Sequence, residues 1–111
     1  MPKIDISDEH VTQVANALGI TTNAGLIFLR IVLENAKLMD NKQKDYGPKN
    51  ISGFGTLGVV VRMSDKFERI KNLFELRRKK AVNESIVDSF RDISNYAVIA
   101  IMVEKKVWPN T

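Results

Sequence analysis

The chain has 111 residues, of which 44% are hydrophobic and 27% are charged, and it contains no cysteine. This length and balance predict one globular domain over residues 1–111 rather than a disordered chain. The lack of cysteine excludes disulfides, thiolate zinc sites and cysteine nucleophiles.

Charge and hydropathy predict a cytoplasmic protein without a membrane partner. The polar first ten residues lack the apolar core of a signal peptide. The longest uncharged apolar run, residues 97–103, is far shorter than the roughly 18 residues that indicate a membrane span. The net charge of +4 is concentrated in residues 77–80 and in four lysines of residues 37–49. Such basic patches attract nucleotides or nucleic acid, although they are also ordinary at helix ends.

Apolar residues recur at helical spacing through the first half of the chain. A first helix is expected over residues 7–18, with Ser7 as its N-terminal cap and Gly19 at its end. A second helix is expected from residue 22 or 23 to about residue 45. The stretch from residue 46 to residue 55 is rich in Gly, Pro and Asn and is expected to be a loop.

Two more helices are expected in the second half of the chain. The third covers residues 56–80, with a core face of Val59, Met63, Phe67, Ile70 and Phe74. The fourth covers residues 83–104 with Asn83 as its cap, and Trp108 beyond it is expected to fold back onto the body. Together these segments predict an all-α protein, a compact bundle of about four helices with the long C-terminal helix at its centre.

The fourth helix combines an acidic stripe with an apolar segment. Because helical residues advance by about 100° each, one face carries Glu84, Asp88, Asp92 and Asn95. Residues 97–103 are apolar on every side. A helix that is apolar all round must be buried, either by its own domain or by a partner chain.

The repeated acids of this stripe need a compensating charge, because like charges one turn apart destabilise a helix. A divalent cation such as magnesium would supply it, since carboxylate oxygens suit such ions. The third helix offers Arg62, Asp65, Lys66 and Arg69 on one side. Two interpretations stay open: a salt-bridged seam in which Arg62 and Arg69 pair with the aspartates, or a site in which acids hold a metal and basic groups hold phosphates.

Three blocks of the sequence, residues 44–47, 62–73 and 84–97, resemble the nucleotide-modification-associated domain of the first type. The resemblance covers roughly residues 25–103. It implies a phage or prophage protein, located in the host cytoplasm if phage-encoded, that is associated with nucleotide or modified-base metabolism.

A weaker resemblance is to the MazG-like all-α nucleotide pyrophosphohydrolases, which bind magnesium through carboxylates on two neighbouring helices. Their signature is a pair of acids three residues apart on each helix. Here Asp88 and Asp92 are four apart, and Asp65 faces Arg69 rather than a second acid. Only half of the signature is therefore present.

The first functional hypothesis is a magnesium-dependent (deoxy)nucleoside triphosphate pyrophosphohydrolase without an organic cofactor. Its candidate catalytic residues are Asp88, Asp92 and Asp65, and its candidate metal ligands are Asp88, Asp92 and Glu84. Its candidate substrate-binding residues are Arg62, Lys66, Arg69, Asn95, Tyr96 and Tyr46. The alternatives are a non-catalytic module that binds a nucleotide or nucleic acid, and a structural helical dimer joined through residues 97–103. A homodimer is expected because a small domain with so apolar a helix has surface to cover.

Overall fold

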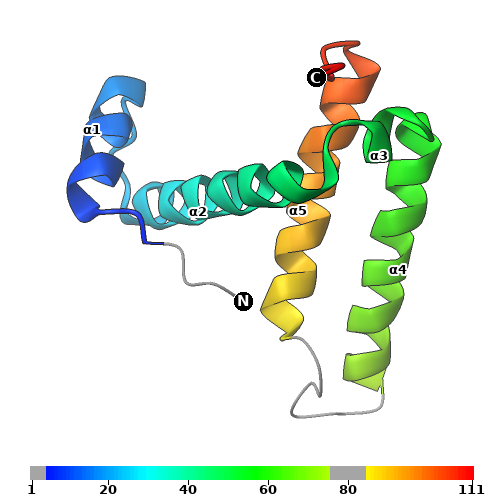
Figure 1. Cartoon of the computed structure of the whole chain (residues 1–111). Helices are drawn as coiled ribbons and strands as arrows, with labels where there is room; N and C mark the ends of the chain where they lie inside the picture. The colour runs from blue at the N-terminus through cyan, green and yellow to red at the C-terminus, as the bar shows by residue number, and fades with distance from the viewer. Residues whose placement is uncertain (1–4, 76–84) are drawn as a thin grey trace. The chain divides into compact units, whose positions relative to one another are not determined.

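The computed structural model describes residues 5–75 and 85–111, and in these ranges the chain is helical and contains no strand (Figure 1). The all-α class predicted from the sequence is confirmed. The helices are α1 (Asp8–Leu18), α2 (Asn23–Tyr46), α3 (Lys49–Ser52), α4 (Gly55–Glu75) and α5 (Ile86–Glu104). The chain divides into two compact units, Met1–Lys44 and Asp45–Thr111. The predicted end of the third helix at residue 80 lies outside the described residues.

Helix α1 begins and ends where the sequence predicts. The hydroxyl of Ser7 accepts a hydrogen bond from the backbone N–H of His10 at 3.1 Å, which satisfies a donor of the first turn. Gly19 follows the last residue with a φ of 74°, and its N–H donates to the carbonyls of Ala15 and Asn16. A residue in this left-handed conformation is usually glycine, because a Cβ is strained there.

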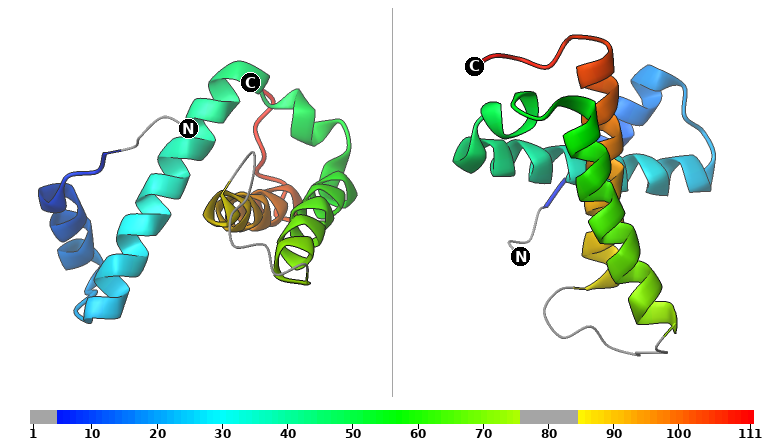
Figure 2. Two further views of the ribbon diagram at one scale, coloured as in Figure 1. Left: turned by 90° about the horizontal axis from the view of Figure 1, so that it is seen from below. Right: turned by 90° about the vertical axis from the view of Figure 1, so that its right-hand side faces the viewer.

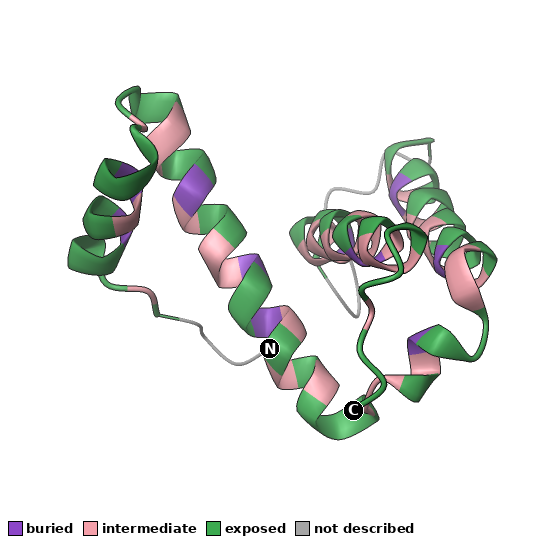
Figure 3. Cartoon of the chain, turned by 90° about the horizontal axis from the view of Figure 1, so that it is seen from above, coloured by how far each residue is buried: buried purple, intermediate pink, exposed green. Residues whose placement is uncertain are grey.

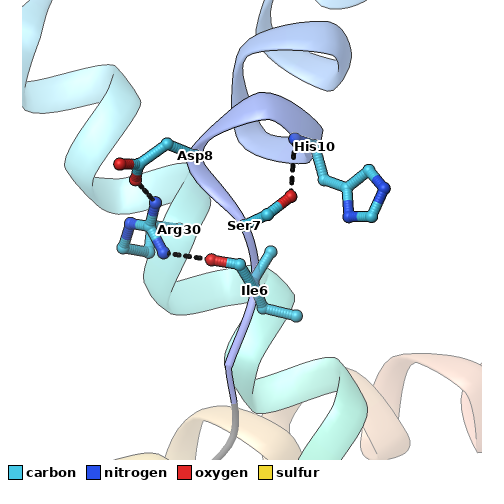
Figure 4. Close-up of polar contacts among 5 residues, drawn as sticks. All are labelled: Ile6, Ser7, Asp8, His10 and Arg30. Carbon is cyan, nitrogen blue, oxygen red and sulfur yellow. Dashed lines mark hydrogen bonds and ion pairs between the residues drawn. The ribbon is translucent and has the colours of Figure 1, made fainter.

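The first unit is held together by an apolar contact between α1 and α2. Val11, Ala15 and Leu29 are buried, and five partly buried apolar residues pack around them: Ile6, Val14, Ile20, Leu26 and Leu33. Polar contacts close the edge of this cluster (Figure 4). Arg30 of α2 donates to the carbonyl of Ile6 at 2.6 Å and forms an ion pair with Asp8.

The turn between α1 and α2 requires glycine at position 25. A Cβ on Gly25 would lie 2.8 Å from Ile20 Cγ2 and 2.9 Å from Thr22 Oγ1, which is closer than van der Waals contact. The backbone N–H of Gly25 donates a hydrogen bond to the Thr22 hydroxyl at 3.0 Å. Thr22 therefore caps the start of α2, as the sequence predicts.

The second unit begins with a short helix that the sequence analysis assigned to a loop. Residues 49–52 form α3 directly after Pro48. Four residues are too few to show helical periodicity, although proline is well suited to the start of a helix because its φ is preset. The prediction of a continuous loop over residues 46–55 is therefore wrong for its middle part.

Helices α4 and α5 lie side by side and antiparallel (Figures 1 and 2). Val59 and Ile70 of α4, and Ser89 and Ile99 of α5, are buried (Figure 3). Met63 is half-buried as expected, but Phe67 and Phe74 of the predicted core face are exposed. The covered side of α4 is narrower than the predicted face, because within this unit α4 has only α5 and the short α3 as helical neighbours.

The predicted start of α5 needs correction, and the burial expected for its apolar segment, by the chain itself or by a partner chain, is supplied only in part by the chain. Its N-terminal cap is Ser85, whose hydroxyl accepts from the Asp88 N–H at 3.1 Å, and not Asn83. The apolar segment at residues 97–103 is not buried all round within the chain. Ile99 is buried, but Val98 and Ile101 are more than half exposed. A helix packed against one long neighbour buries one side only, whatever the composition of the other side.

The C-terminal tail returns to the start of the second unit, as the sequence predicts. Lys106 adopts a φ of 60°, and the Val107 N–H donates to the Met102 carbonyl, which turns the chain after α5. The indole N–H of Trp108 then donates to the carbonyl of Pro48 at 3.0 Å. Over the described ranges no single helix has the length and apolar composition of a membrane span, although α1 and α2 together, bent by 115° at their junction, meet both requirements.

Candidate functional site

A charged pair joins α4 to α5. The Lys66 ammonium lies 2.9 Å from a carboxylate oxygen of Asp92, and the two side chains are only 25% and 11% exposed. Both residues lie on the sides of their helices that face each other, where apolar contacts would be expected. An ion pair thus joins the two helices where a salt-bridged seam was predicted, but Lys66 makes it rather than Arg62 or Arg69.

A second contact of the same seam lies one turn away. Arg69 of α4 donates from Nη1 to the hydroxyl of Ser89 at 2.6 Å and to the carbonyl of Ser85 at 3.3 Å. Ser89 is fully buried. The guanidinium thus binds the N-terminal end of α5 through its backbone as well as a side chain. We call Lys66, Arg69, Ser89 and Asp92 the polar seam.

The remaining predicted basic residue points to a different element. Arg62 donates from Nη2 to the backbone carbonyl of Asn50 at 3.0 Å, so it fixes α3 to α4. The prediction that Arg62 pairs with the aspartates of α5 placed this guanidinium on the wrong neighbour. The side-chain oxygen of Asn50 is buried and has no hydrogen-bond partner.

The other predicted site residues are distributed around the seam. Asp88 is half-buried in the first turn of α5, and Asn95 and Tyr96 are half-buried further along this helix. Asp65 on α4 and Tyr46 at the end of α2 are exposed. Glu84 lies outside the described residues.

The predicted magnesium ligands do not form a cluster in the described part of the chain. No group of three or more His, Asp or Glu side chains there is arranged to hold a metal ion. The carboxylate of Asp92 instead contacts the Lys66 ammonium. Since Glu84 is among the residues not described, the magnesium site stays a prediction.

The serines of the site are not among the residues predicted from the sequence. Ser85 and Ser89 are one helical turn apart, and Ser89 and Asp92 are three apart, so all three share one side of α5. A hydroxyl on the covered side of a helix needs a hydrogen-bond partner, and this requirement was the available signal. The role of Asn50 could not be predicted in this way, because Arg62 binds its backbone carbonyl, a group that every residue has.

The fold and the seam together define an all-α protein whose two long C-terminal helices meet across a charged interface. The family model described as nucleotide modification associated domain 1 matches residues 42–103, which is more than half of the 111 residues. The chain belongs to this family, which indicates a nucleotide-related role. The match confirms the resemblance but begins at residue 42 rather than at about residue 25. The searches of curated proteins and of solved structures gave no match.

Proposed function

We propose that this chain binds a nucleotide at the polar seam between α4 and α5, through the phosphate groups. All four residues of the seam lie inside the segment that matches the family. The description of that family supports a nucleotide as the ligand class. The proposal concerns binding and does not depend on a metal ion.

The observation that carries the proposal is the withdrawal of the Lys66–Asp92 pair from solvent. Removing two charges from water costs several kcal/mol per ion, and their mutual attraction often fails to recover it. An apolar pair of similar volume would join two helices equally well. A charged pair kept at such a position is thus better explained by ligand recognition than by stability.

The chemistry of the seam suits phosphate. A lysine ammonium has three donors and a guanidinium has five, and both bind phosphate oxygens. In the proposed site, Asp92 orients the Lys66 ammonium, and the exposed quarter of the Lys66 side chain gives a ligand access to it. Ser89 positions Arg69 in the same way. Tyr96 and Asn95, further along α5, are the candidates for contacts with the base.

The test is calorimetric titration of the full chain with a panel of nucleoside and deoxynucleoside triphosphates in EDTA. We expect binding that is lost in the double variant Lys66→Met/Asp92→Leu. Replacing both partners avoids leaving one charge buried. The matched control is Lys71→Met/Glu75→Leu, which removes an exposed ion pair from the same helix. Equal affinity in both double variants, or no binding to any nucleotide, would contradict the proposal.

Magnesium-dependent hydrolysis of a nucleoside triphosphate is the second candidate, in a phage or prophage context and the host cytoplasm. It is favoured by Asp92, a nearly buried carboxylate one helical turn from Asp88. When bound, magnesium would neutralise phosphate charge and polarise the phosphoryl group. We expect pyrophosphate release that requires magnesium or manganese and that Asp92→Asn abolishes. Nucleotide binding that EDTA leaves unchanged, without turnover, would reject this candidate and keep the first.

A further inference from the structure

Helix α5 presents an exposed apolar stripe on the side away from the polar seam. Four of its residues are each between 51% and 55% exposed: Val87, Phe90, Val98 and Ile101. Ser94, also exposed, lies at the middle of the stripe. At about 100° per residue, these five positions fall within about 80° of arc. They form one narrow line along the helix that residues 5–75 and 85–111 leave exposed.

The stripe is symmetric about Ser94. Phe90 and Val98 lie four positions before and after it, and Val87 and Ile101 lie seven positions before and after it. When a second copy of α5 is laid antiparallel on the first, Val87 faces Ile101 and Phe90 faces Val98. Ser94 then faces its own counterpart. Such self-complementarity is what a two-fold symmetric interface requires.

We propose that two copies of this chain pair through this stripe, with their α5 helices antiparallel and the two-fold axis at Ser94. The steps of three and four residues keep the stripe on one side of the helix for about 21 Å. The small serine at the centre lets the helices approach closely, and larger apolar residues lie on either side of it. The proposal is independent of the nucleotide-binding function, because it uses the opposite side of α5.

The charges at the ends of α5 favour the antiparallel arrangement. Asp88 lies in the first turn, and at the other end Lys105 and Lys106 outnumber Glu104, the last residue of the helix. Antiparallel pairing brings the acidic end of each helix toward the basic end of its partner. Parallel pairing would place like charges together at both ends. The helix macrodipoles favour the same choice.

The exposed side of α4 does not have this symmetry. Around the exposed Ser64, Leu57 and Val60 lie seven and four positions before it, but Glu68 and Lys71 lie four and seven positions after it. An antiparallel pairing about Ser64 would bury those charges against apolar residues, which is costly. The stripe on α5 is therefore the better surface for a second copy.

The size of the interface sets its expected strength. A single pair of helices this long covers less than the roughly 800 Å² per partner of a standard stable interface. We therefore expect a reversible dimer that dissociates on dilution and not a permanent one.

Disulfide cross-linking of the full chain tests the arrangement without background, because the chain has no cysteine. At a helix spacing of 8–10 Å, facing Cα atoms on radii of about 2.3 Å are roughly 4–5 Å apart, within disulfide reach. We expect Ser94→Cys to form a covalent dimer under mild oxidation. Val87→Cys alone is expected to form no covalent dimer, because its two copies would be about 21 Å apart. A mixture of Val87→Cys and Ile101→Cys is expected to cross-link.

Ser64→Cys, at an exposed serine on α4, is the matched control and is expected to form no covalent dimer. Equal cross-linking of Ser94→Cys and Ser64→Cys would overturn the proposal, because it would indicate random collision. Rapid cross-linking of Val87→Cys with itself would indicate a parallel pair and would also overturn it. Failure of Ser94→Cys to cross-link would do the same.

A second measurement does not depend on a cysteine variant. Sedimentation velocity over a concentration series is expected to show a monomer–dimer equilibrium for the unmodified chain. Phe90→Glu is expected to abolish the dimer with unchanged helical circular dichroism, since the residue is exposed in the monomer. Leu57→Glu on α4 is the control and is expected to leave the equilibrium unchanged. A chain that stays monomeric at every concentration would overturn the proposal.

Discussion

The two units of this chain join their helices by opposite means. In the first unit, α1 and α2 meet through buried apolar residues, and the charged pair of Arg30 and Asp8 stays at the exposed edge. In the second unit, the charged pair of Lys66 and Asp92 lies inside the helix–helix contact. The family match covers residues 45–103 of the second unit and only the last three residues of the first. The first unit indicates that apolar packing is sufficient to hold two helices together. The charged pair inside the α4–α5 contact therefore needs an explanation other than stability.

The largest expected effect comes from breaking the charged pair on one side only. Lys66→Met leaves the Asp92 carboxylate nearly buried without this partner, and we expect it to lower the free energy of unfolding by about 3 kcal/mol. Urea unfolding of the full chain measures the change. Lys66→Met/Asp92→Leu is expected to recover most of the loss.

The control for this variant is Lys71→Met, which breaks an exposed pair with Glu75 on the same helix. Exposed pairs of this kind contribute about 0.5 kcal/mol or less. If Lys66→Met lowers the free energy of unfolding no more than Lys71→Met does, the Lys66–Asp92 pair behaves like an exposed pair. The contrast between the charged α4–α5 contact and the apolar α1–α2 contact then does not hold.

The next effect is a cavity in the apolar unit. Leu29→Ala removes a buried side chain that contacts α1, and we expect a loss of about 2–3 kcal/mol. Hydrogen exchange is expected to show the loss of protection in α1 and the start of α2, while the amides of α4 and α5 keep theirs. Ile27→Ala, at an exposed position of α2, is the control and is expected to change stability by less than about 0.5 kcal/mol. Equal loss of protection in both units would show that they unfold as one.

The smallest effect compares two matched helix caps. Ser7 and Ser85 have nearly the same backbone conformation, with φ of −66° and ψ of 148° and 154°, and each hydroxyl accepts a backbone N–H at 3.1 Å. We expect Ser7→Ala and Ser85→Ala each to destabilise its helix by about 1 kcal/mol. Hydrogen exchange measures this as lost amide protection at the start of α1 and of α5. A much larger cost at Ser85 would contradict a purely capping role, since Arg69 binds its carbonyl and not its hydroxyl.

Local signals explain which parts of the fold the sequence predicts. Ser7 and Gly19 mark the ends of α1 because capping depends on neighbouring residues alone. The start of α5 is ambiguous by the same rules, since Asn83 and Ser85 are both good caps. The structure uses Ser85, whose carbonyl Arg69 binds from α4. That contact depends on how the two helices are aligned, which no local pattern contains.

Prediction of the site from the sequence is limited in the same way, because it lacks the alignment of the two helices. Helical spacing places Arg62, Lys66 and Arg69 on one side of α4, and this grouping is correct as far as the side of the helix is concerned. Which of them meets Asp92 depends on the axial offset between α4 and α5, and the structure gives Lys66. The partial exposure of residues 97–103 has a related cause, because composition predicts burial but not whether the chain itself or a partner chain supplies it.

The contact of Trp108 with Pro48 has a practical consequence. The chain contains a single tryptophan, and this residue is half-buried in the second unit, where its indole donates to the Pro48 carbonyl. Its intrinsic fluorescence is therefore a reporter for the unit that carries the family match, while far-ultraviolet dichroism reports helices of both. A difference between the fluorescence and dichroism midpoints during denaturation would show that the first and second units unfold separately.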